Sequence, residues 1–404
     1  MKILVLNAGS SSHKSCLFDI SKQEATDQNP VPVWRGQLDW SHRVGAVELS
    51  AKTDSGTSVK ESIETESRQE GLQRLLDTLC DGPTQVLDSL SEIDVVGHRV
   101  VHGGEAYQNS VRITPEVKQA IQELCPLAPA HNPANLQGIK AMEQLLGDIP
   151  QVAVFDTAFH AWMPEAATIY PGPREWLEQG IRRYGFHGIS HQYVAHQAAK
   201  MLQQDLTDLK LISCHLGNGC SLAAVKHGYS VDTTMGFTPL DGLMMGSRSG
   251  SVDPGILVHL MRQGYSADQL DRLLNKESGL KGLSGISSDL RLIEDAIAQD
   301  DPRAQLAFDV FIHRLCQGIG AMVASLEGLD TLVFTAGIGE NSPLVWEHAC
   351  KSFSFLGLKI DPSMHRSAND QVISAEDSEV TVLVIHTQEE WAIAQECMTV
   401  LQPA

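Results

Sequence analysis

Residues 211–221, LISCHLGNGCS, place a histidine and two glycines in a tight turn between two apolar runs. Asn218-Gly219 is among the strongest short signals for a β-hairpin, so we expect strand, turn and strand. The glycines could serve only to supply positive φ. They also let backbone N–H groups approach an anion closely, with His215 at the rim of the turn. On this motif alone, a structural turn and an anion-binding turn are equally good interpretations.

The N-terminal stretch shows the same pattern. Residues 2–6 form a short apolar run that is followed by Asn7, a serine-rich turn and Lys14, and residues 15–18 are expected to form the returning strand. Lys14 distinguishes this turn from the central one, although a single lysine is most simply a solvated side chain.

A third unit lies near the other end of the chain. Residues 332–334 form an apolar strand that runs into a glycine turn at 335–341, and a helix is expected to begin near Ser342. Three such units suggest a duplicated nucleotide-binding scaffold in which phosphates lie on turns and a helix N-terminus. Neither GxxxxGK[ST] nor GxGxxG occurs, which disfavours P-loop and Rossmann folds.

The composition narrows the class of protein. A chain of 404 residues is long enough for two domains with their own cores, and 42% hydrophobic with 20% charged residues is typical of a globular protein. The net charge of -20 argues against nucleic acid as a partner, because that binding depends on Lys and Arg neutralising phosphates. An anionic substrate would therefore need a local group of arginines, helped by a divalent cation.

The eight cysteines are scattered, and no CxxC pair occurs. Cys16, Cys214 and Cys316 lie in apolar runs and are expected to be reduced core residues. No signal peptide is expected, because only four apolar residues follow Lys2 before Asn7. No run of eighteen apolar residues occurs, so we expect no membrane-spanning helix and a cytoplasmic protein.

Several single polar residues have a structural interpretation as good as a functional one. Arg99 lies in an apolar strand, where an arginine usually pairs with a carboxylate. Asp156 follows the strand expected at 151–155, at the edge where open α/β sheets bind ligands, but it could be a helix N-cap. Glu389 could be a first-turn carboxylate favoured by the helix dipole. His131 could simply brace its proline-rich loop.

Hydrophobic periodicity and capping residues predict the remaining elements and one change of domain. Ser190 is expected to cap a helix that ends at Leu202. The change of domain is placed just after Asp156, where a second series of units begins. Other strands are expected at 31–38, 94–101 and 380–385, and other helices at 64–79, 115–124, 132–146, 266–274, 301–326 and 389–401, with a further helix beginning at Asp253-Pro254.

Eight motifs in order along the chain together resemble the acetate kinase family. They are NAGSSSHK at 7–14, GHRVVHGG at 97–104, HNP at 131–133, FDTAFH at 155–160, YGFHG at 184–188, CHLGNG at 214–219, MGFTPLDGLMMGSRSG at 235–250 and TAGIGEN at 335–341. The resemblance implies an α/β fold of two duplicated actin-like (ribonuclease H-like) domains with ATP in the cleft between them. It also implies a C-terminal helix that returns to the N-terminal domain, so that residues 1–156 with 388–404 form one domain and residues 157–387 the other. A homodimer and Mg²⁺ or Mn²⁺ as cofactor are implied as well.

The resemblance carries roles to matching positions. It implies catalytic roles for Asp156, His187, Arg248, Arg99 and His131, and an acyl-group pocket lined by Arg99, Val101, Ala130 and Pro239. It implies Asn7 and Glu389 at the metal. The positions implied to bind ATP are Lys14, His215, Leu216, Gly217, Asn218, Gly219, Asp289, Leu290, Arg291, Gly337, Ile338, Gly339, Glu340 and Asn341. Three positions depart from the family pattern: His13 and Leu290 replace an apolar and an aromatic residue, and Ala130 is smaller than usual.

The reaction implied is reversible transfer of a phosphoryl group from ATP to acetate, giving ADP and acetyl phosphate. Acetate is already ionised at pH 7, since a carboxylic acid has a pKa of roughly 4 to 5, so it needs no base. Asp156 is therefore better suited to orient a metal-bound water than to remove a proton. The obstacle is the repulsion between anionic acetate and the polyphosphate of ATP. Arg99 and Arg248 would reduce this repulsion, because a guanidinium stays charged and binds oxyanions through two hydrogen bonds. His187 would donate a hydrogen bond to a phosphoryl oxygen.

Two alternatives remain open at this point. A smaller Ala130 leaves room for propionate, so a propionate kinase is a close variant. A nucleotide-gated binding protein of the same superfamily would bind ATP without forming an acyl phosphate. The pair of arginines argues against that protein, because hydrolysis by water needs no carboxylate clamp.

Overall fold

A computed structural model describes residues 1–9, 12–22, 29–41, 43 and 45–402. Its contacts divide the chain into two compact units, Met1–Ala158 with Gln388–Ala404, and Phe159–Thr387. That each unit is an independent domain with the predicted boundaries stays a prediction.

The first unit is built on a mixed sheet with the strand order β5-β4-β3-β2-β1-β6-β8-β7. Strand β1 pairs antiparallel with β2, with Asn7 opposite Lys14, and parallel with β6, which is parallel to β8. The predicted hairpin is therefore present, although its serine turn lies partly outside the described residues. The strands are β1 Lys2–Ala8, β2 Ser12–Asp19, β3 Trp34–Asp39, β4 Val47–Thr53, β5 Ser58–Ile63, β6 Val95–Val100, β7 Val111–Arg112 and β8 Gln151–Phe155.

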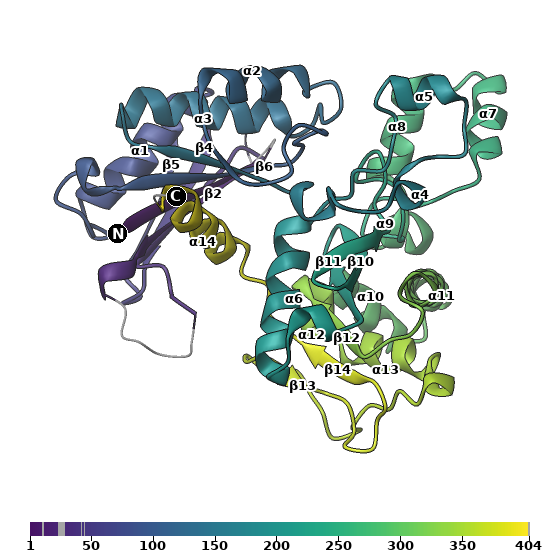
Figure 1. Ribbon diagram of the computed structural model, residues 1–404. Helices are drawn as coiled ribbons and strands as arrows, with labels where there is room; N and C mark the ends of the chain where they lie inside the picture. The colour runs from purple at the N-terminus through teal and green to yellow at the C-terminus, as the bar shows by residue number, and fades with distance from the viewer. Residues whose placement is uncertain (10–11, 23–28, 42, 44, 403–404) are drawn as a thin grey trace. The chain divides into compact units, whose positions relative to one another are not determined.

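Helices cover both faces of this sheet (Figure 1). Helices α1 (Arg68–Cys80), α2 (Pro115–Glu123) and α3 (Asn132–Leu146) lie on one side, and α14 (Glu389–Leu401) packs against β1, β6 and β8. Side chains alternate along a strand, so Val100 packs on the α3 side while Gly97 faces α14. A Cβ at Gly97 would lie 2.6 Å from Ile393 and 2.7 Å from Cys397, which shows how closely α14 approaches the sheet.

The second unit repeats the arrangement of six of the eight strands of the first, β3-β2-β1-β6-β8-β7. Its order is β11-β10-β9-β12-β14-β13, where β9, β10 and β11 are antiparallel and β12 and β14 run parallel to β9. The repeated order and directions confirm the predicted α/β fold with two duplicated actin-like sheets. The strands are β9 Leu211–Leu216, β10 Cys220–Lys226, β11 Tyr229–Thr233, β12 Thr331–Thr335, β13 Gln371–Val372 and β14 Thr381–Val384.

The helices of the second unit begin at strong capping residues in several cases. Asp253, Ser266 and Asp301 each accept hydrogen bonds from the first turn of the helix that follows. The helices are α4 Glu165–Thr168, α5 Arg174–Glu178, α6 Gly188–Leu202, α7 Pro254–Arg262, α8 Ala267–Lys276, α9 Gly279–Ser284, α10 Leu290–Ile297, α11 Pro302–Leu326, α12 Ala336–Asn341 and α13 Pro343–Lys351.

Helix α11 is, by length and hydropathy alone, apolar enough to cross a membrane, which the absence of an eighteen-residue apolar run had not indicated. The helix packs against β10, α9, α10 and α13. Buried Phe311, Leu315 and Ile319 lie along its inner face. This packing is that of a core helix, and a single candidate is weak evidence for a membrane span.

Three local predictions were wrong. Ser190 does not cap α6, which begins after His187; the Ser190 hydroxyl is buried and lies 2.8 Å from the Thr387 hydroxyl. The predicted glycine turn at 335–341 is mostly the short helix α12. The strand predicted at 31–38 begins only at Trp34.

Candidate active site

In the first unit, three predicted residues meet at the carboxyl ends of parallel strands. Arg99 on β6 donates from Nη2 to Asp156 Oδ2 at 2.5 Å and from Nη1 to Asn7 Oδ1 at 3.3 Å. Asp156 is almost fully buried, whereas one fifth of the Arg99 side chain is exposed. Burial opposes the charge on Arg99, but the adjacent Asp156 and Glu389 outweigh it and raise the pKa of the guanidinium. Arg99 is thus paired with a carboxylate, as the structural interpretation expected, and that carboxylate is itself a predicted site residue.

Glu389, at the start of α14, belongs to the same group. Burial, together with the charges of Asp156 and Glu390, raises its pKa to about 7, while Arg99 and Lys14 act in the opposite direction. Ionising Glu389 therefore adds negative charge to an environment that already holds carboxylates. A bound cation would relieve this repulsion.

The oxygen atoms of this group suit a hard divalent cation. Asp156 Oδ1 is buried, and no hydrogen bond is found for it among the described residues. Asn7 supplies an amide oxygen and Glu389 a second carboxylate. Within the described part of the chain, no cluster of three or more His, Cys, Asp or Glu residues forms a complete metal cage. Mg²⁺ usually takes one or two carboxylates and completes its shell with water and phosphate oxygens, so Asn7, Asp156 and Glu389 are donors of a kind that could hold it.

Two buried amides in the first turn of α3, Asn132 and Asn135, tie this helix to the ends of two strands. Asn135 accepts a hydrogen bond from Val101 N at 3.1 Å and donates one to Ala8 O at 2.7 Å. Asn132 accepts from His102 N and donates to His102 O, both at 3.1 Å. These bonds fix the ends of β1 and β6 to α3. Val101 is buried, Ala130 is exposed, and His131 is the N-cap residue of α3 without a side-chain capping bond. The amides were not predicted as site residues, although Asn132 stands in the HNP motif.

In the second unit, His187 and Arg248 converge over Gly219. A Cβ built on Gly219 would lie 3.4 Å from His187 Cε1, 3.5 Å from His187 Nε2 and 3.5 Å from Arg248 Nη1. His187 is a non-glycine residue with a φ of 57°, immediately before α6. Such a left-handed backbone is uncommon and often marks a functional position. The two predicted donors therefore border the same space.

Arg248 is a partly buried cation. Its Nη1 donates to Pro239 O at 3.2 Å, and among the described residues no carboxylate raises its pKa. Burial lowers the pKa of its guanidinium, because desolvation disfavours the charged form. An anion bound beside Arg248 would offset that cost, unlike at Arg99, where Asp156 already does so.

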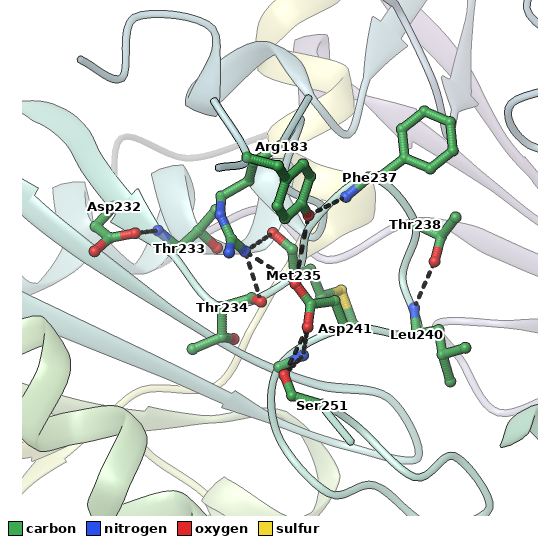
Figure 2. A network of polar contacts seen from close by, with 12 residues as sticks. Arg183, Asp232, Thr233, Thr234, Met235, Phe237, Thr238, Leu240, Asp241 and Ser251 are labelled. Carbon is green, nitrogen blue, oxygen red and sulfur yellow. Dashed lines mark hydrogen bonds and ion pairs between the residues drawn. The ribbon is translucent and has the colours of Figure 1, made fainter. Parts of the chain in front are cut away.

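The loop from residue 235 to 250, which carries Pro239 and Arg248, is fixed by a polar network (Figure 2). Arg183 donates to Thr234 O and Met235 O, both at 2.9 Å, and lies 3.5 Å from the Asp241 carboxylate. Ser251 donates to the same carboxylate at 2.6 Å. Tyr170 receives a hydrogen bond from Phe237 N at 2.9 Å. These contacts hold an irregular loop in place without a helix or strand.

A cavity of about 530 Å³ contains most of the predicted nucleotide residues of the second unit. Its lining combines the central hairpin turn, the start of α10 and the helix α12. The predicted lining residues are Gly217, Asn218, Asp289, Leu290, Arg291, Gly337, Ile338 and Asn341, and four others, Ser288, Glu294, Ser342 and Arg366, also line it. Lys14 belongs to the first unit and pairs in register with Asn7.

Five other residues of the predicted nucleotide motifs do not line this cavity. His215 is not at the rim of the turn but lies buried in β9, stacked on His187 at 4.1 Å. Leu216 and Gly339 are buried in the core, and Gly219 lies beside His187. Glu340 accepts from Ala336 N and Thr387 N, at 2.8 and 3.0 Å, so its carboxylate holds α12 in position.

Sequence reasoning missed Glu294 and Arg366. The Ser342 hydroxyl donates to Glu294 at 2.5 Å, which links α10 to the start of α13. No local motif marks either residue; only the helical period of α10, which places Glu294 one turn after Leu290, would have indicated a shared face.

Comparison with known proteins finds relatives that match this chain over nearly its full length. The model of the acetokinase family matches residues 2–395. Acetate kinase of Trichormus variabilis is 61% identical over 403 residues, which are 99% of this chain and 100% of the relative. The crystal structure of Porphyromonas gingivalis acetate kinase superposes with a TM-score of 0.92 at 43% identity, covering 99% of this chain and all of that one. A propionate kinase from Francisella tularensis gives a TM-score of 0.89 at 38% identity, with 98% of each chain covered.

Proposed function

This chain belongs to the acetokinase family, and we propose that it is an acetate kinase that transfers the terminal phosphoryl group of ATP to acetate. The reaction is reversible and gives ADP and acetyl phosphate. A carboxylate oxygen of acetate forms the new P–O bond while the bond to the β-phosphate oxygen breaks. The relatives named acetate kinase, which match this chain over its full length, support this assignment.

The observation that carries the proposal is the convergence of His187 and Arg248 over Gly219. Phosphoryl transfer needs little covalent help from the protein, but it needs fixed donors around the equatorial oxygens of the phosphoryl group. Arg248 would bind these oxygens through its guanidinium, and His187 would donate from Nε2. Gly219 leaves the space between the two donors open, because it has no side chain.

The nucleotide would bind in the cavity next to this space. Gly217 and Asn218 line the cavity and belong to the same hairpin turn as Gly219. The turn therefore connects the two regions, and the phosphate chain would follow it toward Arg248. Backbone N–H groups in a glycine turn suit this task, since they donate to phosphate without adding charge.

The first unit would hold the acid and the metal. Arg99 keeps its charge in a buried environment and would bind the acetate carboxylate, while Asn7, Asp156 and Glu389 would hold Mg²⁺, directly or through water. Bound Mg²⁺ would neutralise part of the phosphate charge. Asp156 remains paired with Arg99, which agrees with an orienting role rather than proton removal. We also propose that the chain is a cytoplasmic homodimer, which a mass measurement in solution would test for the oligomer.

The assignment is tested by trapping acyl phosphate with hydroxylamine in the presence of ATP and Mg²⁺. Acetate and propionate are assayed side by side, each with wild type and Arg248→Ala. We expect acetyl hydroxamate from wild type, a higher kcat/KM for acetate than for propionate, and a loss of about 10²- to 10³-fold in the variant.

Three results would change the assignment. A higher kcat/KM with propionate would make the protein a propionate kinase, as the Francisella structure and the small Ala130 allow. ATP binding without any hydroxamate would favour a nucleotide-gated binding protein. Full activity in Arg248→Ala would contradict the role of Arg248 in either kinase.

A further inference from the structure

We propose that Ser221 and His191 are positioning residues that set which ring nitrogen of His187 carries the proton. The inference rests on the proposed function, in which His187 donates from Nε2. It concerns a chain of side-chain hydrogen bonds behind His187, which we call the serine–histidine relay and which consists of Ser213, His191, Ser221 and His187.

The relay is continuous and buried. The Ser213 hydroxyl lies 2.9 Å from His191 Nδ1, His191 Nε2 lies 2.7 Å from the Ser221 hydroxyl, and that hydroxyl lies 2.9 Å from His187 Nδ1. Ser213, His191 and Ser221 are all fully buried. Two serines from adjacent strands, β9 and β10, thus connect to two histidines at the start of α6.

The single hydroxyl proton of Ser221 couples the tautomers of the His187 and His191 rings. The Ser221 hydroxyl has one proton, so it can donate to only one of the two nitrogens that it contacts and must accept from the other. If it donates to His187 Nδ1, then His191 must donate from Nε2, and Ser213 must donate to His191 Nδ1. His187 then carries its own proton on Nε2, at the edge that borders Gly219 and Arg248.

The opposite orientation would not suit the site. If His187 donated from Nδ1 to Ser221, neutral His187 would present a lone pair at Nε2 toward the phosphoryl oxygens. It could donate from Nε2 only as a cation, and Arg248 Nη1 already borders the same space. Burial lowers the pKa of His191 well below its usual range, so a second cation in the relay is also disfavoured. The neutral relay therefore lets His187 donate to an anion without adding a charge.

The direct test is NMR on protein labelled with ¹⁵N in the histidine rings, because ring nitrogen shifts distinguish the two tautomers. Signals are assigned with His187→Gln and His191→Gln. We expect both His187 and His191 to carry hydrogen on Nε2 in wild type with ADP bound. A proton on Nδ1 of His187 overturns the inference, and this readout does not depend on whether the protein makes acetyl phosphate.

Ser221→Ala tests the functional consequence. We expect kcat to fall by roughly 10- to 100-fold, the range for residues that orient another group through a hydrogen bond, with the KM for ATP within about twofold. The matched control is Ser230→Ala, which removes another fully buried hydroxyl, at 2.7 Å from His160 Nδ1, and should leave kcat unchanged. An unchanged kcat in Ser221→Ala would overturn the inference, as would an equal loss in both variants. If Ser221→Ala does not fold, the tautomer measurement on wild type still decides.

Discussion

Replacing Gly219 with alanine should abolish most activity while leaving the fold intact. The added methyl group would lie 3.4 Å from His187 Cε1 and 3.5 Å from both His187 Nε2 and Arg248 Nη1. These are ordinary contact distances, and Gly219 is not among the described residues with positive φ, so neither the side chains nor the backbone must move. The variant should therefore fold like wild type.

The loss can be worked out from the same distances. A phosphoryl oxygen that accepts from both His187 and Arg248 would lie about 2.7 to 3.2 Å from each nitrogen, and the methyl group occupies that space. Losing one such donor costs about 10²- to 10³-fold, or roughly 3 to 4 kcal/mol, of transition-state stabilisation. We therefore expect kcat/KM for ATP to fall by at least about 10²-fold.

The assay is the hydroxylamine trap for acyl phosphate, combined with thermal unfolding and calorimetric binding of ADP. The melting temperature should change by no more than a few degrees, since a tolerated Gly-to-Ala change shifts stability by only about 0.4–1 kcal/mol. The control is Gly320→Ala in α11, where a Cβ would meet nothing within 4 Å, and which should keep wild-type activity. A Gly219→Ala enzyme with wild-type kcat/KM would refute the reasoning.

Three further predictions concern the first unit. The pKa of Glu389 is raised to about 7 in the folded protein, so without metal the folded state should lose stability as pH rises from about 4.5 through 7. Glu389→Gln should remove up to roughly 3 kcal/mol of this loss, measured by urea unfolding in EDTA at pH 5 and pH 8. Equal changes in the free energy of unfolding between the two pH values for wild type and variant would contradict the prediction. EDTA should abolish activity, and added Mg²⁺ should restore it. The Mg²⁺ concentration needed for half-maximal activity should be higher below pH 7, because Glu389 is then protonated. A Mg²⁺ requirement that does not change with pH would show that Glu389 does not bind the metal. Asn135→Ala leaves Val101 N and Ala8 O without their hydrogen-bond partner. The variant should therefore lower the free energy of unfolding, measured by urea titration, by on the order of 3 kcal/mol. A decrease of less than about 0.5 kcal/mol would show that water replaces the amide.

Much of the fold was predictable because it depends on local patterns. Strand β8 and helix α14 have the predicted bounds, since an apolar run and a helical period marked them. The central hairpin was predictable from its Asn-Gly turn.

The wrong predictions depend on contacts between distant residues. Residues 336–341 form a helix whose first N–H is bound by Glu340, and Glu340 also binds Thr387 N, which no local pattern shows. Ser190 looks like a capping residue in sequence, but its hydroxyl is used by His215 and Thr387 inside the unit. His13, which takes a position that is apolar in the family pattern, is buried.

The candidate site was predictable as a set of residues but not as a geometry. Motifs indicated His187, Gly219 and Arg248 separately, yet only the folded chain shows that they border one space. The serine–histidine relay was invisible in the sequence, because Ser213 and Ser221 look like ordinary strand residues until the register of β9 and β10 places both beside α6.

The most direct test of the proposed reaction is ³¹P NMR of the product made from ATP and acetate labelled with ¹⁸O in its carboxylate. Direct attack by acetate predicts acetyl phosphate whose phosphorus signal carries the isotope shift of an ¹⁸O in the P–O–C bridge. ATP consumption that yields only unlabelled inorganic phosphate would contradict the account.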